Sequence, residues 1–323
     1  MISPDQHPIG SGFGPASTAM DVIQGIDLAG QTAIVTGGYS GIGVETVRAL
    51  ASAGAQVIVP ARDRDKAARN LAGIAGVEIE AMDLADPASI AAFAGRINAS
   101  GRPLSILINS AGIMAAPEAR DAQGRESQFA INHLGHFRLV LGLWPALTAA
   151  GHARVVCVSS RGVHIAGVDF DDIDFRTRPY DKWLAYGQAK TANALFAIGL
   201  DRRGRKEGIR AFSLHPGQII TDLSRHLSQQ EVDSFEMWEA DGSLRNDPAN
   251  GIKNVQQGAA TSVWCATSPA LEGLGGVYCE DCDVAVVGDD PSTRKGVAPW
   301  AADSELAERL WQVSEQMTGL RLG

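Results

Sequence analysis

The chain has 323 residues, of which 45% are hydrophobic and 20% are charged. This is an ordinary globular composition and is sufficient for one large domain with a substantial core. The formal net charge of −9 disfavours nucleic acid and anionic membrane surfaces as partners, because the summed field repels both. No stretch is long and apolar enough to span a bilayer, and residues 1–24 lack the cationic start and the apolar run of a secretory signal.

The cysteine content favours a reducing compartment. The cysteines are too few and too unevenly spaced for a disulfide framework: Cys157, Cys265, Cys279 and Cys282. The last two form a CxxC pair, but neither a second pair, nor histidines at ligand spacing, nor the start of a helix accompanies it. We therefore expect a cytoplasmic protein without a bound metal.

The first 30 residues are predicted to form an arm that lies on the body of the protein. They are rich in Gly, Ser and Pro until Ser17 and Thr18, which can cap a short helix through Ile23.

From Gln31 onward, short β-rich apolar runs alternate with amphipathic segments. Helical apolar spacing covers Val44–Ala53, Ile90–Ile97 and Phe129–Leu143. With right-handed crossovers, this alternation predicts an α/β fold with a single Rossmann-type, doubly wound parallel sheet and helices on both faces. The predicted strands are Thr32–Thr36, Gln56–Pro60, Val77–Met82, Ser105–Asn109, Arg154–Ser159, Arg210–Leu214 and Gly276–Cys279.

Two insertions interrupt the alternation, at residues 161–184 and 222–250. Long insertions in α/β proteins usually lie at the carboxyl ends of the strands, where they cover a substrate. We therefore assign residues 31–290 to a Rossmann-fold catalytic domain with two substrate loops. Residues 291–323 are predicted to be a helical extension in which Ser304 caps a helix with one apolar face, made of Leu306, Leu310, Val313 and Met317.

A glycine-rich run, TGGYSGIG, follows the first predicted strand and opens a helix. Gly37 permits the tight turn, Gly41 lets the backbone approach a pyrophosphate, and Gly43 allows the helix to pack closely on the strand. Glycines alone are weak evidence, but their position between a strand and a helix predicts a dinucleotide site.

The end of the second predicted strand indicates which nucleotide is bound. In NAD-binding sheets an acidic residue about twenty positions after the glycines takes the adenosine ribose hydroxyls. Here residues 60–62 read Pro-Ala-Arg. The Arg62 guanidinium can grip the 2′-phosphate of NADP, and Ser40 can add a hydroxyl contact. The alternative is that Arg62 is a solvated charge paired with Asp63 or Asp65.

Tyr186 and Lys190 are four residues apart and therefore share one face of a helix. A tyrosine with its ordinary pKa near 10 is a poor proton shuttle at neutral pH unless a nearby cation favours its phenolate. Lys190 can supply that charge. The pair alone is modest evidence, but three further motifs follow predicted strands where an open α/β sheet binds ligands: Asn109-Ser110-Ala111-Gly112, Ser159-Ser160-Arg161-Gly162 and Pro216-Gly217 with Thr221.

Together these motifs resemble the short-chain dehydrogenase/reductase family over nearly the whole chain. TGGYSGIG, NSAG, SS, YGQAK and HPG occur in the family's order and on the expected elements. Further motifs are similar to the branch of retinol dehydrogenases, protochlorophyllide reductase and the WW-domain-containing oxidoreductase: STAM at residues 17–20, ESQFAINHLGHF at 126–137 and GGVYCEDC at 275–282. The WW domains themselves are absent.

The resemblance implies a catalytic tetrad of Asn132, Ser160, Tyr186 and Lys190. Ser160 would donate a hydrogen bond to the substrate carbonyl, and Tyr186 would donate the proton. Lys190 would hold the nicotinamide ribose and lower the pKa of the tyrosine. Asn132 would order a water. The resemblance also implies NADP(H) as the cofactor. The residues expected to contact this cofactor are Gly37, Tyr39, Ser40, Gly41, Ile42, Gly43, Arg62, Asp83, Leu84, Asn109, Ala111, Gly112, Tyr186, Lys190, Pro216, Gly217, Ile219 and Thr221. Asp83 would accept from the adenine amino group, although an ordinary strand-end turn residue is the alternative.

The expected substrate is a ketone or aldehyde, or the corresponding alcohol, with a bulky apolar body. Aromatic residues of the insertions and one histidine are candidates for its pocket: His164, Trp183, Phe235 and Trp238. Equally, the aromatic residues could simply pack the insertions against the body. His133 and His136 are expected to be packing or surface residues, since no third ligand stands at a spacing suited to a metal. The family also implies a symmetric homo-oligomer, either a dimer or a tetramer.

Three other functions remain open on the sequence. A reductase of carbon–carbon double bonds would use the same Tyr and Lys. A non-catalytic protein that senses NADP would be expected to lose both residues. A sugar-nucleotide epimerase or dehydratase would want a glycine in place of Ser40 and a larger C-terminal domain.

Overall fold

The computed structural model describes residues 1–235, 237–239, 241–288 and 295–322. The boundary expected between residues 290 and 291 lies outside the described residues. Within the described ranges, no helix has the length and apolar character needed to cross a membrane.

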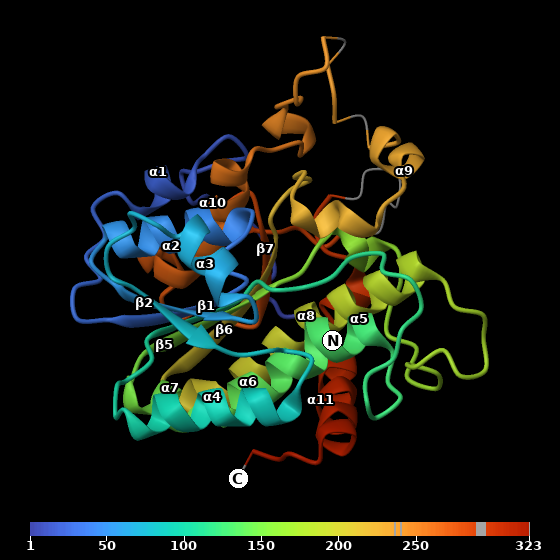
Figure 1. Ribbon diagram of the computed structural model, residues 1–323, viewed down its shortest axis with the longest axis horizontal. Coiled ribbons are helices and arrows are strands. Elements are labelled where there is room, and N and C mark those ends of the chain that lie inside the picture. Colours follow the sequence, from blue (N-terminus) through green and yellow to red (C-terminus); the bar gives the residue numbers. More distant parts are fainter. Residues whose placement is uncertain (236, 240, 289–294, 323) are drawn as a thin grey trace.

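An eight-stranded sheet forms the centre of the molecule, in the order β3-β2-β1-β4-β5-β6-β7-β8 (Figure 1). The strands from β3 to β7 pair in parallel, and β8 is antiparallel to β7. The chain order reverses between β1 and β4, as in a doubly wound fold. The strands are β1 (Thr32–Thr36), β2 (Gln56–Ala61), β3 (Val77–Ala81), β4 (Ile106–Asn109), β5 (Ala153–Val158), β6 (Ile209–His215), β7 (Val277–Glu280) and β8 (Asp283–Val284).

Helices cover both faces of the sheet, which confirms the predicted architecture. One layer, above the sheet in Figure 1, contains α1 (Ala19–Ile23), α2 (Ile42–Ser52), α3 (Arg64–Asn70) and α10 (Val255–Thr267). The other contains α4 (Pro87–Ala99), α6 (His136–Gly142), α7 (Trp144–Ala149), α8 (Lys182–Gly204) and α11 (Ser304–Thr318). Short helices lie between them: α5 (Ser127–Phe129) and α9 (Gln229–Asp233).

The core consists of two apolar layers separated by the sheet. Along β1, Ala33 and Val35 belong to the layer with α2 and α10, whereas Ile34 belongs to the layer with α4 and α8. All five residues of β1 are buried, which explains why the strand reads as a nearly continuous apolar run. The cysteines are also buried, and burial raises the pKa of Cys282 to about 12.

The N-terminal arm is fixed to the β7–β8 edge. The Gln6 side chain accepts from the Tyr278 amide and donates to the carbonyls of Tyr278 and Ala285. The Asp283 carboxylate accepts from the Ile9 amide at 2.9 Å. Thr18 caps α1 with a reciprocal contact to Asp21, as the sequence predicts.

Some local expectations were wrong. The helix expected over Phe129–Leu143 is divided into α5, a π-helical segment (Ala130–Gly135) and α6. The cap of α11 is Asp303, whose carboxylate accepts from the amides of Glu305 and Leu306, and Ser304 is the first helical residue. The short strand β8 was not predicted, and the limits of β2 to β7 shift by one residue because helix and strand ends follow hydrogen bonding rather than residue type.

Candidate active site

The glycine-rich turn between β1 and α2 has no room for side chains. A Cβ on Gly37, whose φ is 66°, would lie 2.9 Å from the Ala111 Cα. A Cβ on Gly41, whose φ is 53°, would lie 2.9 Å from the Thr221 Cγ2. A Cβ on Gly43 would overlap the Gly37 carbonyl oxygen. The turn is therefore a bare backbone cradle in front of the α2 N-terminus, and this geometry suits a dinucleotide.

A cavity of about 850 Å³ lies over the carboxyl ends of the strands and extends from this turn to the second insertion. It brings together most of the predicted site: Gly37, Tyr39, Ser40, Gly41, Ile42, Arg62, Asp83, Leu84, Ala111, Gly112, Ser160, Trp183, Tyr186, Lys190, Pro216, Gly217, Ile219, Thr221 and Phe235. Five predicted residues are not among those lining the cavity: Gly43, Asn109, Asn132, His164 and Trp238.

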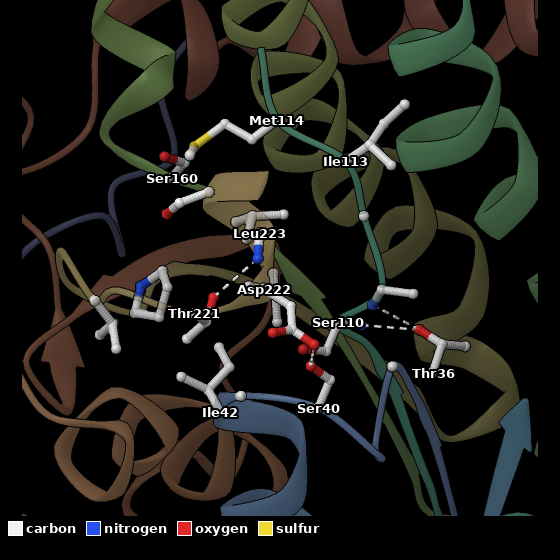
Figure 2. Close-up of a pocket in the computed structure, with 18 of the residues that line it drawn as sticks. Thr36, Ser40, Ile42, Ser110, Ile113, Met114, Ser160, Thr221, Asp222 and Leu223 are labelled. Atoms are coloured by element: carbon white, nitrogen blue, oxygen red, sulfur yellow. Dashed lines mark hydrogen bonds between the residues drawn. The ribbon is translucent and has the colours of Figure 1, made fainter. Parts of the chain in front are cut away.

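Four charged or hydroxyl side chains line the end of the cavity beside β2 and α3, where the sequence predicts the adenosine of the cofactor. Arg62 is exposed at the end of β2. The Lys66 ammonium donates to the Asp222 carboxylate at 2.6 Å, and the Ser40 hydroxyl donates to the same oxygen at 3.1 Å. Figure 2 shows Asp222 pointing toward Ser40 from the loop that follows β6. Sequence reasoning missed Lys66 and Asp222, although Lys66 is only four residues after Arg62 in the sequence.

Ser160, Tyr186 and Lys190 form the other end of the cavity. Ser160 lies two residues beyond the end of β5, and its hydroxyl accepts from the Gly162 amide at 3.0 Å. Tyr186 and Lys190 lie on buried turns of α8. The Lys190 ammonium is 5.7 Å from the centroid of the Tyr186 ring and donates to the Val158 carbonyl at 3.1 Å. The three side chains thus converge from β5 and α8.

Burial is the main cause of the shifted pKa values of Tyr186 and Lys190. It raises the pKa of Tyr186 to about 12, and a hydrogen bond with the Ser160 side chain acts in the opposite direction. Burial lowers the pKa of Lys190 to about 8. The hydrogen bond with Ser160 therefore favours the Tyr186 phenolate, and the expected contribution of the Lys190 charge stays a prediction.

Asn132 holds the loop that follows β4. Its side-chain oxygen accepts from the Ile113 amide at 2.9 Å, and its side-chain nitrogen donates to the Ile113 carbonyl at 2.9 Å. A Cβ on Gly112 would lie 3.0 Å from the Asn132 Oδ1 and 3.7 Å from the Lys190 Nζ. Asn132 thus lies behind the loop. Because Gly112 has no side chain, Asn132 and Lys190 can both lie close to the backbone of this loop.

The second insertion is connected to the start of α8. The Lys182 ammonium is 2.6 Å from the Glu231 carboxylate, which also accepts from the Trp183 indole at 3.3 Å. The Trp183 ring lies edge-on to the rings of Tyr186 and Phe235, at 6.4 and 6.1 Å between centroids. These contacts place an aromatic wall beside the candidate proton donor.

Two other predicted pocket residues lie elsewhere. Trp238 is 43% exposed. The His164 ring is 3.1 Å from the Gly296 carbonyl, which belongs to the segment before α11.

Comparison with known proteins identifies the family. The short chain dehydrogenase family profile matches residues 31–232. The chain belongs to this family. It is 46% identical over 296 residues to a Streptomyces antibioticus protein named "Probable oxidoreductase", covering 89% of this chain and 97% of that protein. It is 36% identical over 302 residues to retinol dehydrogenase 12 of Homo sapiens, covering 92% of this chain and 89% of the relative.

A solved structure has the same fold. A crystal structure of an uncharacterized protein from Mycobacterium paratuberculosis superimposes with a TM-score of 0.73 at 31% identity, covering 95% of this chain and 99% of that chain. The predicted family, and the branch with the retinol dehydrogenases, are therefore confirmed. The chain is an oxidoreductase of a family that uses a nicotinamide cofactor.

Proposed function

We propose that this short-chain dehydrogenase interconverts a ketone or aldehyde and its alcohol, with NADP(H) as cofactor and Tyr186 as the general acid and base. The observation that carries the proposal is the convergence of Ser160, Tyr186 and Lys190 at one end of a cavity whose other end is the glycine cradle. The bound cofactor would supply the hydride that adds to the carbonyl carbon.

The chain's own residues would handle the oxygen and its proton. The Ser160 hydroxyl would donate a hydrogen bond to the carbonyl oxygen, and Tyr186 would transfer its phenolic proton to that oxygen as negative charge develops. A phenol whose pKa is raised to about 12 by burial is protonated at neutral pH, which is the form that reduction requires. Lys190 would hold the nicotinamide ribose, and its positive charge would stabilise the tyrosinate left after proton transfer.

The preference for NADP over NAD is part of the proposal and rests on the adenosine end. Residues 60–62, at the end of β2, include no carboxylate to bind ribose hydroxyls and repel a phosphate, and the Asp63 carboxylate caps α3. Arg62, Lys66 and Ser40 line the cavity there and could donate to a 2′-phosphate.

A bulky apolar substrate is supported by the lining beside Tyr186. Trp183 and Phe235 contact each other on the cavity wall, and Met114 and Leu223 also line the cavity. Such a wall favours substrates with a large hydrophobic body next to the carbonyl group. A set of ketones, aldehydes and enones incubated with NADPH, followed by product analysis, would distinguish carbonyl reduction from reduction of a carbon–carbon double bond.

The assignment of the general acid is tested by Tyr186→Phe, which removes only the hydroxyl group. We expect kcat for carbonyl reduction to fall at least about a hundredfold, the usual contribution of general acid catalysis, while NADPH binding persists. Steady-state absorbance of NADPH gives kcat, and fluorescence titration gives the dissociation constant.

The matched control is Tyr180→Phe. The Tyr180 hydroxyl donates to the Ala116 carbonyl at 2.9 Å and is not among the cavity-lining groups. This variant should retain turnover per folded molecule. If Tyr186→Phe reduces carbonyls at the wild-type rate, Tyr186 is not the general acid.

A further inference from the structure

His136 lies behind the active site and replaces a hydrogen bond that the π-helical segment loses. In a regular α-helix the backbone amide of His136 would donate to the Asn132 carbonyl. Here that amide donates to the His133 carbonyl instead. The His136 ring takes over, with its Nδ1 at 2.8 Å from the Asn132 carbonyl oxygen. Local departures from α-helical bonding of this kind are frequent at functional sites.

The contacts of the ring fix its tautomer. A carbonyl oxygen only accepts, so Nδ1 carries the proton and donates it to Asn132. Nε2 is then the acceptor, and it lies 2.9 Å from the Thr36 hydroxyl, which must donate to it. Thr36 can do so because its oxygen accepts the backbone amides of Ser110 and Ala111, at 2.9 and 3.0 Å. Every polar atom of this chain of contacts has a partner (Figure 2 shows Thr36 and Ser110).

The chain of contacts joins three segments whose relative positions matter for the proposed reaction: the end of β1, the loop after β4 and the π-helical segment. Thr36 ends β1 and directly precedes the glycine cradle. Ser110 and Ala111 begin the loop against which Gly37 packs. Asn132 holds the same loop at Ile113 and lies near Lys190 across Gly112. The His136 ring is fully buried and is the direct link between Thr36 and Asn132.

We propose that His136 is a positioning residue with two separable roles in the reaction proposed above. Through Nε2 and Thr36 it fixes the cofactor cradle against the loop that follows β4. Through Nδ1 it fixes the carbonyl of Asn132 and so the arrangement of Asn132 and Lys190 beside the proton donor.

The two roles can be separated by isosteric amides. In His136→Asn the side-chain nitrogen can stand near the position of Nδ1 and keep the bond to Asn132, while the bond to Thr36 is lost. In His136→Gln the side-chain oxygen can reach the position of Nε2 and keep the bond from Thr36, while the bond to Asn132 is lost. His136→Leu loses both.

We expect His136→Asn to weaken NADPH binding about tenfold with little change in kcat. We expect His136→Gln to lower kcat about tenfold with little change in NADPH affinity, and His136→Leu to show both losses. Fluorescence titration of NADPH measures the first effect without any carbonyl substrate, and single-turnover reduction measures the second. The melting temperature of each variant reports folding separately.

His133→Leu is the matched control. It removes a neighbouring buried imidazole whose Nε2 contacts Ser314 on α11 at 2.7 Å. It should lower the melting temperature without changing kcat or NADPH affinity per folded molecule. Equal losses of affinity and kcat in the Asn and Gln variants would overturn the two-role proposal, as would wild-type values in both. Failure of the wild-type protein to bind NADPH or to reduce any carbonyl would instead refute the proposed function.

Discussion

Arg62 lies at the end of β2, on the open side of the cavity. The alternative that it is neutralised by its neighbours is not supported, because it forms no ion pair with the residues that the structure describes. Asp63 does not pair with Arg62, because its carboxylate accepts from the Lys66 amide and caps α3. The guanidinium is therefore available for a phosphate.

Arg62→Ala should weaken NADPH binding about ten- to a hundredfold, corresponding to roughly 1.5 to 3 kcal/mol for hydrogen bonds to a charged group. NADH lacks the 2′-phosphate, so its affinity should hardly change. Titration of both nucleotides against the variant measures the difference. Arg69→Ala, an exposed charge in the last turn of α3, is the matched control for a general loss of positive field. Equal weakening of NADPH and NADH by Arg62→Ala would contradict a phosphate contact.

Residues whose place at the cavity depends on backbone position could be predicted from the sequence. The glycines of the first turn, Ser160 after β5, and the Tyr186–Lys190 pair follow from strand ends and helical spacing, which are local properties. Lys66 and Asp222 could not be found in this way, because they meet across 156 positions of sequence. The same holds for His136 and Thr36, which are 100 positions apart.

The loop after β6 holds two of the groups that the proposed function assigns to the cofactor. Asp222 accepts from Ser40 and Lys66, which line the adenosine end of the cavity together with Arg62. Hydrogen bonds from these two groups hold the pKa of Asp222 below its usual range, so it is ionised at neutral pH. A 2′-phosphate bound at the same donors would be repelled by this carboxylate.

Asp222→Asn should therefore strengthen NADPH binding by about two- to fivefold, the range set by an exposed ion pair of up to about 1 kcal/mol. The change should shrink at high salt and should be absent with NADH. Isothermal titration at two ionic strengths measures it. Asp233→Asn, which neutralises an acidic residue of α9 bonded to Gln229, is the control for the overall charge of the insertion. Weaker NADPH binding in Asp222→Asn would mean that the carboxylate closes over the bound cofactor instead of competing with it.

Element type was predictable for every strand except β8, because buried parallel strands read as apolar runs and the partly exposed edge strand β3 alternates apolar and charged residues. The π-helical segment was not predictable, since its apolar spacing is close to that of an α-helix and the deciding contact is the His136 ring with Asn132. The cap of α11 shows the same limit, because Asp303 and Ser304 are both good capping residues and only the hydrogen bonds distinguish them.

At the scale of the whole molecule, buried histidines make the folded state sensitive to mild acid. Burial lowers the pKa of His133 to about 3 and that of His136 to about 4, and it lowers the pKa of His215 well below its ordinary value. These rings are neutral in the folded protein at pH 5, whereas in the unfolded chain they take up protons below about pH 6.5. The chain therefore takes up protons when it unfolds between about pH 6.5 and pH 5. As a result, the free energy of unfolding must fall as the pH is lowered through this range.

Two carboxylates act in the opposite direction. Burial raises the pKa of Glu126 and of Glu280, so the folded protein takes up protons at these sites before the unfolded chain does. Their effect offsets part of the histidine contribution. Carboxylates with lowered pKa, such as Asp172 and Glu231 at about 2, destabilise the folded state only at lower pH, as they protonate in the unfolded chain first. The window between pH 6.5 and pH 5 is therefore governed mainly by the histidines.

His133→Leu should flatten the pH dependence of stability in this window. Each fully buried histidine contributes a slope of up to about 1.4 kcal/mol per pH unit below its unfolded pKa, and the variant lacks one of them. We expect the variant to be less stable than the wild type at pH 7, because a buried contact with Ser314 is lost, and the gap to narrow or close as the pH falls to 5. Urea unfolding followed by tryptophan fluorescence at several pH values measures both slopes. Parallel curves for the two proteins would show that His133 is protonated in the folded state or that it keeps a low pKa in the unfolded chain, and either result would contradict the assigned cause.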